Sequence, residues 1–157
     1  MQYPGYNSGK IILVEGDYFP FSILNIIQLQ DNEWYYILKD INGLKHFMPA
    51  ESYNNYGFKP GEEIFCKIEK INCTGRIFLE PEHPFYKVGD IYYFDVIKYP
   101  NPDDENVLIV KEISGNLIKV PVNSTKKVDI SEGKKVRCSV KSIKKGKLNL
   151  EISPVYA

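Results

Sequence analysis

The stretch "INCTGRIFLEPEHPFYKVGD", residues 71–90, returns in altered form near the end of the chain as "IKKGKLNLEISPVY", residues 143–156. In both copies a glycine and a basic residue open a short run that ends in Leu-Glu. The basic residue is Arg76 in the first copy and Lys147 in the second. A phrase that recurs in this way is typical of a duplicated structural unit, so each copy is expected to close one of two similar units.

The rest of the chain repeats in the same order. Gly16-Asp17 aligns with Gly89-Asp90, and the aligned stretches that follow are "LKDINGLKHFMP" (38–49) with "VKEISGNLIKVP" (110–121), and "PGEEIFCKIEKI" (60–71) with "EGKKVRCSVKSI" (132–143). The alignment predicts two units that account for nearly all of the 157 residues. The expected boundaries are an N-terminal arm at 1–9, a first repeat at 10–83, a linker at 84–88 and a second repeat at 89–154.

Each unit has the pattern of β-structure. In 62–71, Ile64, Cys66 and Ile68 fall on one face of an alternating run, and 134–143 alternates in the same way. A period of two over this length is typical of a half-buried strand and not of a helix. Asn-Gly at 42–43 and Ser-Gly at 114–115 are turn signals between such strands.

Five short strands, with one helical turn expected within 50–58, describe an OB-type barrel. We therefore expect an all-β protein made of two tandem five-stranded OB-type antiparallel barrels. An antiparallel sandwich with the same number of strands is the alternative fold.

Charge is divided between the two halves of the chain. Residues 1–105 contain 9 Lys and Arg against 16 Asp and Glu, a net charge of −7, whereas 106–157 contain 11 against 4, a net charge of +7. A basic half can form a face for nucleic acid or for an acidic partner. It can also be a lysine-coated surface that maintains solubility.

The sequence favours a non-enzymatic cytoplasmic protein. The start "MQYPGYNSGK" lacks the pattern of a secretory signal, and the most apolar window, "YFPFSILNII", is far shorter than a membrane span, so no membrane partner is expected. Three widely spread cysteines suit a reducing compartment. No catalytic Ser/His/Asp or Cys/His set, phosphate-binding glycine loop or metal-ligand spacing is apparent, so no catalytic residues, cofactor or metal are expected.

The first repeat carries a set of short motifs in a fixed order. It has Gly16-Asp17 before its first strand, an aromatic stretch "EWYYILKD" (33–40), Gly43-Leu44-Lys45-His46 after a turn, Gly61 before the fourth strand, and "NCTGRIFL" (72–79) at the close. In these motifs it resembles the RNA-binding OB repeat named after the ribosomal small-subunit protein S-one. Asn72 stands where that family has an acidic residue, and the second repeat resembles the family through the first, without the histidine.

The resemblance implies a nucleic-acid site in the first repeat. Its aromatic residues Trp34, Tyr35 and Tyr36 would stack bases, and His46 and Arg76 would lie on the same exposed face. Strand parity is left open by the sequence. If Lys39 points to solvent, Tyr35 does too and Trp34 and Tyr36 turn inward, and the opposite parity reverses this. The aromatic residues can equally be core residues.

The second repeat supplies positive charge. Lys135, Arg137 and Lys141 share the outward parity of one strand and could hold phosphates without sequence preference. The acidic, proline-rich loop at 99–106 fits a protein partner better. The sequence therefore predicts a module that binds single-stranded nucleic acid, RNA ahead of DNA. The alternatives are a protein–protein interaction adaptor or a structural OB module of a larger assembly, with a further unit expected to follow the Pro-Val-Tyr at 154–156.

Overall fold

The structure, a computed structural model, describes residues 10–98, 106–122 and 134–153. The expected N-terminal arm, the acidic loop at 99–105, the lysines at 126 and 127 and the Pro-Val-Tyr at 154–156 lie outside the described residues. The chain divides into two compact units, residues 1–82 and 83–157. Each unit has its own hydrophobic core.

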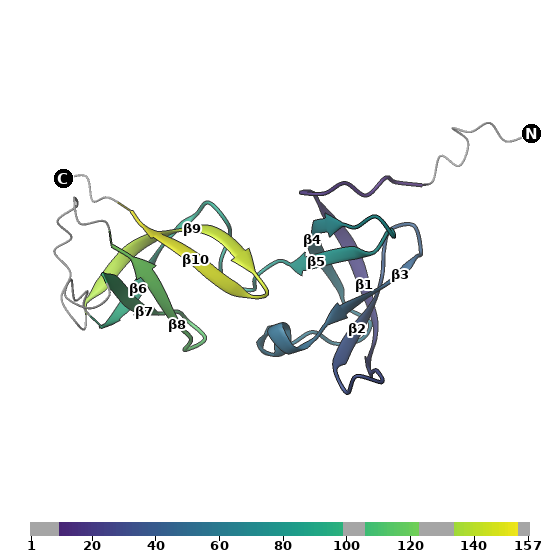
Figure 1. Ribbon diagram of the computed structural model, residues 1–157, viewed down its shortest axis with the longest axis horizontal. Helices are drawn as coiled ribbons and strands as arrows, with labels where there is room; N and C mark the ends of the chain where they lie inside the picture. The colour runs from purple at the N-terminus through teal and green to yellow at the C-terminus, as the bar shows by residue number, and fades with distance from the viewer. Residues whose placement is uncertain (1–9, 99–105, 123–133, 154–157) are drawn as a thin grey trace, which may run out of the picture. The chain divides into compact units, whose positions relative to one another are not determined.

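Both units are five-stranded antiparallel sheets of the same topology (Figure 1). The first has the order β3-β2-β1-β4-β5, and its strands are β1 (Tyr18–Gln28), β2 (Trp34–Lys39), β3 (Lys45–Pro49), β4 (Glu63–Ile71) and β5 (Ile77–Pro81). The second has the order β10-β9-β6-β7-β8, and its strands are β6 (Ile91–Lys98), β7 (Val107–Lys111), β8 (Leu117–Pro121), β9 (Lys135–Lys144) and β10 (Lys147–Ile152). The prediction of an all-β protein with two OB-like units is confirmed.

The helical turn expected within 50–58 is a 3₁₀ helix, η1 (Glu51–Tyr56), between β3 and β4. It ends at Gly57, whose φ of 72° is left-handed and favours a residue without a Cβ. On its inner side Tyr53 is buried, and the Tyr53 hydroxyl donates a hydrogen bond of 3.0 Å to Glu80 on β5. The helix therefore ties the β3–β4 connection to the last strand of the unit.

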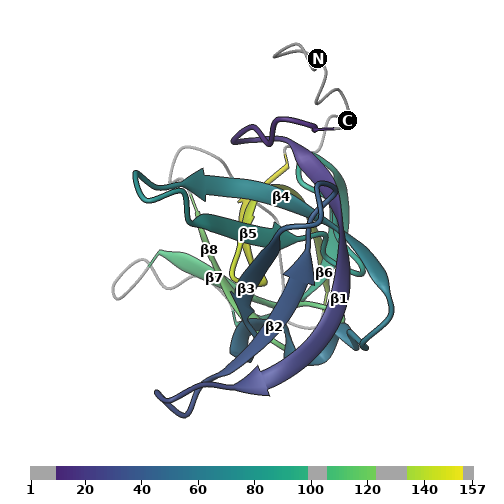
Figure 2. The ribbon, with the colours of Figure 1, turned by 90° about the vertical axis from the view of Figure 1, so that its right-hand side faces the viewer.

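The long first strand of each unit pairs with two different neighbours. In β1, Tyr18–Ser22 pairs with β4 and Ser22–Gln28 pairs with β2, so the strand curves through the unit (Figure 2). A bulge at Leu24 accompanies this change of partner, and a second bulge interrupts β4 between Ile68 and Lys70. Because bulges bend strands and increase twist, the sheet curls until β3 contacts β5.

The second unit repeats these irregularities at the aligned positions. Its first strand is interrupted between Val96 and Lys98, and the pairing of β9 with β10 shifts at Lys141. There, β8 contacts β10. The aligned pairs Phe19–Cys66 and Tyr92–Cys138 also face each other in the same register. The duplication seen in the sequence is therefore a duplication of strand pairing and curvature.

Inward-facing residues of the alternating strands form the two cores. The largest fully buried side chains include Phe21, Ile23, Leu38, Met48 and Ile68 in the first unit, and Phe94, Leu108, Val110, Val120 and Val140 in the second. Cys66 and Cys138 are completely buried at matching positions, as their parity predicts. Burial raises the pKa of both thiols, that of Cys138 to about 12, whereas Cys73 is exposed.

We expect the exposed thiol of Cys73, and not the other two, to react rapidly with a thiol-specific reagent in the native protein. The reactive species is the thiolate, and burial suppresses it at Cys66 and Cys138. Timed labelling followed by mass spectrometry measures this, and Cys73→Ser should remove the fast phase. Two fast-reacting thiols in the native state would contradict the buried positions of the aligned pair.

Residues 84–88, expected to form a linker, contribute to the core of the second unit. Tyr86 is buried, its ring is stacked on Phe94 with centroids 5.5 Å apart, and it meets Tyr92 edge-on at 4.9 Å. The Tyr86 hydroxyl accepts a hydrogen bond of 2.9 Å from the amide of Ile113. The pattern of prolines around 84 predicted only a rigid connection because a single tyrosine gives no periodicity from which burial can be inferred.

Replacing Tyr86 should therefore destabilise the second unit. We expect Tyr86→Ala to lower its free energy of unfolding by about 3–5 kcal/mol, because a large buried ring is lost. The exposed neighbour Phe85 provides the control. Phe85→Ala should change the free energy of unfolding of the second unit by about 0.5 kcal/mol or less. Urea unfolding followed by far-ultraviolet circular dichroism reports both units, while Trp34 fluorescence reports the first. Equal stability of the two variants would contradict the packing described here.

Candidate nucleic-acid interface

Three of the predicted site residues meet at one hollow on the first unit. Tyr35 on β2, His46 on β3 and Arg76 before β5 line an open hollow of about 610 Å³. The remaining lining residues are Leu29, Leu44, Lys45, Phe47, Thr74, Gly75 and Ile77. Segments that are far apart in sequence thus place two aromatic rings, an imidazole and two cationic side chains around the same space. The rings are those of Tyr35 and Phe47, and the cations are Lys45 and Arg76.

The parity of β2 decides which aromatic residue takes part. Lys39 is exposed, so Tyr35 and Ile37 lie on the outward side, while Tyr36 and Leu38 are buried. The Tyr35 ring meets the ring of Phe47 edge-on, with centroids 6.4 Å apart. Phe47 lies on β3 opposite Ile37 and is 46% exposed. The two rings therefore form a paired aromatic surface on the outside of β2 and β3.

The Tyr35 hydroxyl is held by a carboxylate at the rim. It donates a hydrogen bond of 2.8 Å to Asp31 in the β1–β2 turn. This hydrogen bond is the main cause that raises the pKa of the Tyr35 phenol, while the positive charge of Arg76 acts in the opposite direction. Tyr35 is thus oriented from one side by Asp31 and lies within the electrostatic reach of Arg76.

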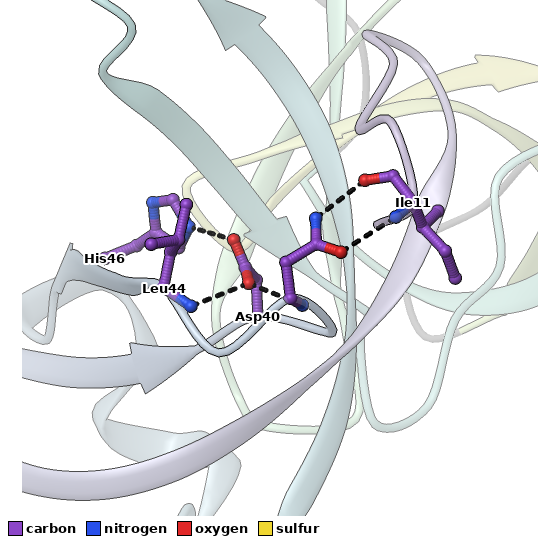
Figure 3. A network of polar contacts seen from close by, with 5 residues as sticks. Ile11, Asp40, Leu44 and His46 are labelled. Carbon is purple, nitrogen blue, oxygen red and sulfur yellow. Dashed lines mark hydrogen bonds and ion pairs between the residues drawn. The ribbon is translucent and has the colours of Figure 1, made fainter. Parts of the chain in front are cut away.

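A buried carboxylate positions His46. The side chain of Asp40 is only 1% exposed, and its Oδ2 lies 2.7 Å from His46 Nε2 (Figure 3). Its Oδ1 accepts hydrogen bonds from the amides of Asn42 at 2.8 Å and Leu44 at 3.0 Å. Burial works to raise the pKa of Asp40, but the hydrogen bonds from His46 and the two amides outweigh it and lower the pKa. Because an ionised carboxylate can only accept, His46 donates through Nε2.

The segment before β1 is tied to the same turn. The side-chain amide of Asn42 accepts a hydrogen bond from the Ile11 amide at 2.8 Å and donates one to the Ile11 carbonyl at 2.7 Å (Figure 3). Asn42 therefore pairs with Ile11 much as a neighbouring strand would. The turn that carries Asp40 is fixed from outside by this pairing and from inside by the buried carboxylate.

Arg76 is presented by a tight turn at the end of β4. Asn72 Oδ1 accepts hydrogen bonds from the amide of Thr74 at 3.1 Å, the hydroxyl of Thr74 at 2.6 Å and the amide of Arg76 at 2.9 Å. Gly75 completes the turn with a φ of 84°. The guanidinium carbon of Arg76 lies 4.9 Å from the ring centroid of Phe78. An amide oxygen at Asn72 thus organises the turn without a carboxylate.

The other predicted residues of the first unit lie elsewhere. Tyr36 is 6% exposed and packs edge-on against Phe58, so its assignment to a binding surface is corrected to a core position. Its parity on β2 is opposite to that of Tyr35, which is the physical reason. Trp34 is half exposed at the start of β2 but does not line the hollow.

The predicted basic stripe of the second unit is engaged in contacts of its own. Lys135 lies 3.0 Å from Asp95, and Lys141 lies 3.4 Å from Glu151. Arg137, between them on β9, is half-buried. The three residues share the outward face of the strand, as expected, but two of them already contact carboxylates. Such exposed pairs are weak and salt-sensitive.

Several contributors to the first-unit site, among them Phe47, Phe78 and Asp40, were not predicted from the sequence. Phe47 follows His46 directly, and its outward position could be inferred only once the parity of β2 was known. Phe78 could have been found from the alternation in "RIFLE" (76–80), which places Arg76 and Phe78 on one face. The role of Asp40 could have been predicted from its position two residues before Asn-Gly, because an acidic side chain there commonly accepts hydrogen bonds from the backbone of the turn.

At the aligned positions that the structure describes, the second unit has no equivalent of this site. Strand pairing places Val107, Ile118 and Lys119 where the first unit has Tyr35, His46 and Phe47. Lys147 follows Gly146 where Arg76 follows Gly75. The β9–β10 turn of the second unit is also shorter than the β4–β5 turn of the first, and its residues Lys145 and Gly146 both have a positive φ. The two units therefore share a fold and differ in the chemistry of this surface.

Comparison with known proteins gives no family assignment. No family model matches the chain, and no curated protein matches it. Among solved structures, a multidomain protein with nucleic acid binding domains from Streptococcus pneumoniae TIGR4 matches 92% of this chain at 11% identity and a TM-score of 0.33, and the chain spans 54% of that protein. A murine DNA binding protein bound with double-stranded DNA matches 88% of this chain and 92% of its own at 16% identity and a TM-score of 0.30. Similarity at this level carries no argument about a ligand.

The described residues contain no group of three or more His, Cys, Asp or Glu side chains that could hold a metal ion. Within the same part of the chain, no helix has the length and apolar character needed to cross a bilayer.

The ionised carboxylate of Asp40 should make the stability of the first unit depend on pH. Its pKa is lower in the folded state than the unfolded value of about 3.9, so its contribution is present above that value and is lost as the pH falls through the folded pKa. We expect Asp40→Asn to lower the free energy of unfolding of the first unit by about 1–3 kcal/mol at pH 7. This difference in stability from the parent should shrink below about pH 4.

Urea unfolding monitored by Trp34 fluorescence at several pH values measures this difference. Asp17→Asn is the control, because it removes an exposed carboxylate and leaves the buried network intact. A difference between Asp40→Asn and the parent that stays constant from pH 7 to pH 3 would show that the carboxylate is not ionised in the folded protein.

Proposed function

We propose that this protein is a non-enzymatic module that binds single-stranded nucleic acid, RNA ahead of DNA, through the hollow on its first unit. The observation that supports this proposal is the convergence of Tyr35, His46 and Arg76, which the sequence placed on three separate segments. Stacking surfaces combined with cations are the features by which proteins hold single strands.

The aromatic pair provides the surface for bases. Tyr35 and Phe47 lie on neighbouring, hydrogen-bonded strands, so their backbones are fixed before any ligand arrives. A base that stacks on such a ring contributes about 1–3 kcal/mol, without a strong preference among the four bases. We therefore expect the first unit to bind single strands with little sequence specificity.

The cations provide contacts for the phosphate chain. The planar guanidinium of Arg76 can hold two phosphate oxygens at once, which an ammonium group cannot do. Lys45 lines the same hollow and adds a second positive charge. His46 is held through Nε2 by Asp40, and its side chain is 14% exposed at the hollow. We expect its Nδ1 to accept a hydrogen bond from a ribose 2′-hydroxyl, the group by which proteins distinguish RNA from DNA.

The preference for RNA rests on the resemblance of 43–46 and 75–79 to the S-one-type repeat. The second unit would add positive potential through Lys135, Arg137 and Lys141, since an exposed ion pair can exchange its carboxylate for a phosphate. This general attraction would assist association and weaken with salt.

The test is fluorescence anisotropy of a labelled mixed-sequence single-stranded RNA, with a DNA of the same sequence in parallel, at low and physiological salt. We expect Tyr35→Ala and Arg76→Ala each to weaken binding by about fivefold or more. Tyr35→Phe keeps the ring and should stay within about twofold of the parent. Lys147→Ala, at the position aligned with Arg76, is the matched control for loss of one positive charge.

The outcomes separate the parts of the proposal. Equal affinity for RNA and DNA would remove the preference for RNA and leave the nucleic-acid site. Equal effects of Arg76→Ala and Lys147→Ala would show that charge alone, and not the hollow, is responsible. No binding of the parent at low salt would overturn the proposed function in favour of a protein-binding adaptor.

A further inference from the structure

The second unit carries an aromatic hollow of its own at a different place on the barrel. Phe85, Tyr86, Tyr92 and Tyr93 line it, together with Asp95, Lys111, Glu112, Ile113 and Lys135, and it measures about 590 Å³. These residues come from the segment before β6, from β6 itself, from the end of β7 and the turn after it, and from the start of β9. None of them aligns with the residues that line the hollow of the first unit.

Two rings in this hollow are open to solvent and supported from behind. Tyr93 is 65% exposed on β6, the strand that pairs with both β7 and β9, and Phe85 is 52% exposed. Tyr86 and Tyr92 lie deeper and pack on Phe94. Their hydroxyl oxygens already accept hydrogen bonds, from the amides of Ile113 and Lys87 respectively. The exposed rings are thus mounted on a layer of packed aromatic side chains.

The charges around the hollow leave positive groups available. Asp95 is engaged by Lys135 at 3.0 Å, and buried Glu112 accepts a hydrogen bond from the amide of Asn116 at 3.0 Å. Lys111 faces Asp95 in the register of β6 with β7, and Arg137 faces Tyr93 in the register of β6 with β9. Within the described residues, neither Lys111 nor Arg137 is in an ion pair.

We propose that this surface is a second site for single-stranded nucleic acid, in which Tyr93 and Phe85 stack bases while Lys111 and Arg137 contact phosphates. The inference rests on the proposed function and extends it, because it gives the second unit a base-stacking role in place of general phosphate attraction. Exposed rings next to available cations fit an anionic ligand with planar groups.

The aligned surface of the first unit keeps a lysine, Lys39, at the position of Lys111 but differs at the other residues of the proposed site. Pro20 occupies the position of Tyr93, Phe65 that of Arg137, and Glu63 that of Lys135. The first unit has its rings and cations on β2, β3 and the turn before β5, whereas the second has them around β6. Duplication thus left two copies of one barrel with ring-and-cation surfaces at different places.

The experiment measures RNA binding by the full chain with substitutions in the second hollow. We expect Tyr93→Ala to weaken binding of a labelled single-stranded RNA by about fivefold or more, and Phe85→Ala to act in the same direction. Tyr93→Phe keeps the ring and should stay within about twofold of the parent. Asp95→Asn should tighten binding by about two- to fivefold at low salt, because it removes a negative charge and releases Lys135.

Each outcome bears on the inference in a defined way. If Tyr35→Ala weakens binding while Tyr93→Ala and Phe85→Ala match the parent, the second site is overturned and the proposed function stands. Loss of affinity in Tyr93→Phe equal to that in Tyr93→Ala would rule out stacking. Weaker binding by Asp95→Asn would show that the surface does not receive phosphate. If the parent fails to bind RNA or DNA, the proposed function and this inference fall together.

Discussion

The architecture of each unit depends on the curvature that β-bulges impose on a five-stranded sheet. If the sheet were flat, the apolar side chains on its inner face would be exposed to solvent and its two edge strands would lie far apart. The bulge at Leu24 lets β1 pair with β4 along its first half and with β2 along its second, and the bulge in β4 bends the other side. As a result, β3 reaches β5, and Tyr35, His46 and Arg76 come to one hollow although they are up to 41 positions apart in the sequence.

Each barrel also uses the segment before its first strand to hold the turn between its second and third strands. In the first unit the Asn42 side chain pairs with the backbone of Ile11. In the second, the Tyr86 hydroxyl accepts from the amide of Ile113. Both turns contain a buried acidic residue, Asp40 or Glu112, that accepts backbone hydrogen bonds within the turn. The same structural requirement is thus met by different side chains.

The acidic residue has a further consequence in the first unit only. Asp40 contacts His46, whereas the position of His46 is occupied by Ile118 in the second unit. A turn that is needed for the fold therefore also orients an imidazole at the proposed binding surface. Because the carboxylate is buried, its interaction with His46 is little screened by water. The site of the first unit is in this sense an elaboration of a structural element that both units possess.

The two units differ more in surface chemistry than in fold. The strand registers and the buried cysteines coincide, because any shift of one residue would turn a core face toward solvent. Outward positions carry no such constraint, so Phe65 and Arg137, or Phe47 and Lys119, can differ without cost to the barrel. This freedom allows two similar barrels to present different ring-and-cation surfaces.

Sequence alone was enough to infer the duplication, the strand character of both units and the inward positions of Cys66 and Cys138, because repetition and a period of two are local properties of the chain. It also placed Tyr35, His46 and Arg76 among the candidate residues, through their motifs. The folded structure was needed to establish that Tyr36 is a core residue, that Phe47 contacts Tyr35, and that Tyr86 packs in the core of the second unit. Those outcomes depend on the parity of β2, whose sequence "WYYILK" does not alternate, on pairing between distant strands and on the packing of single side chains.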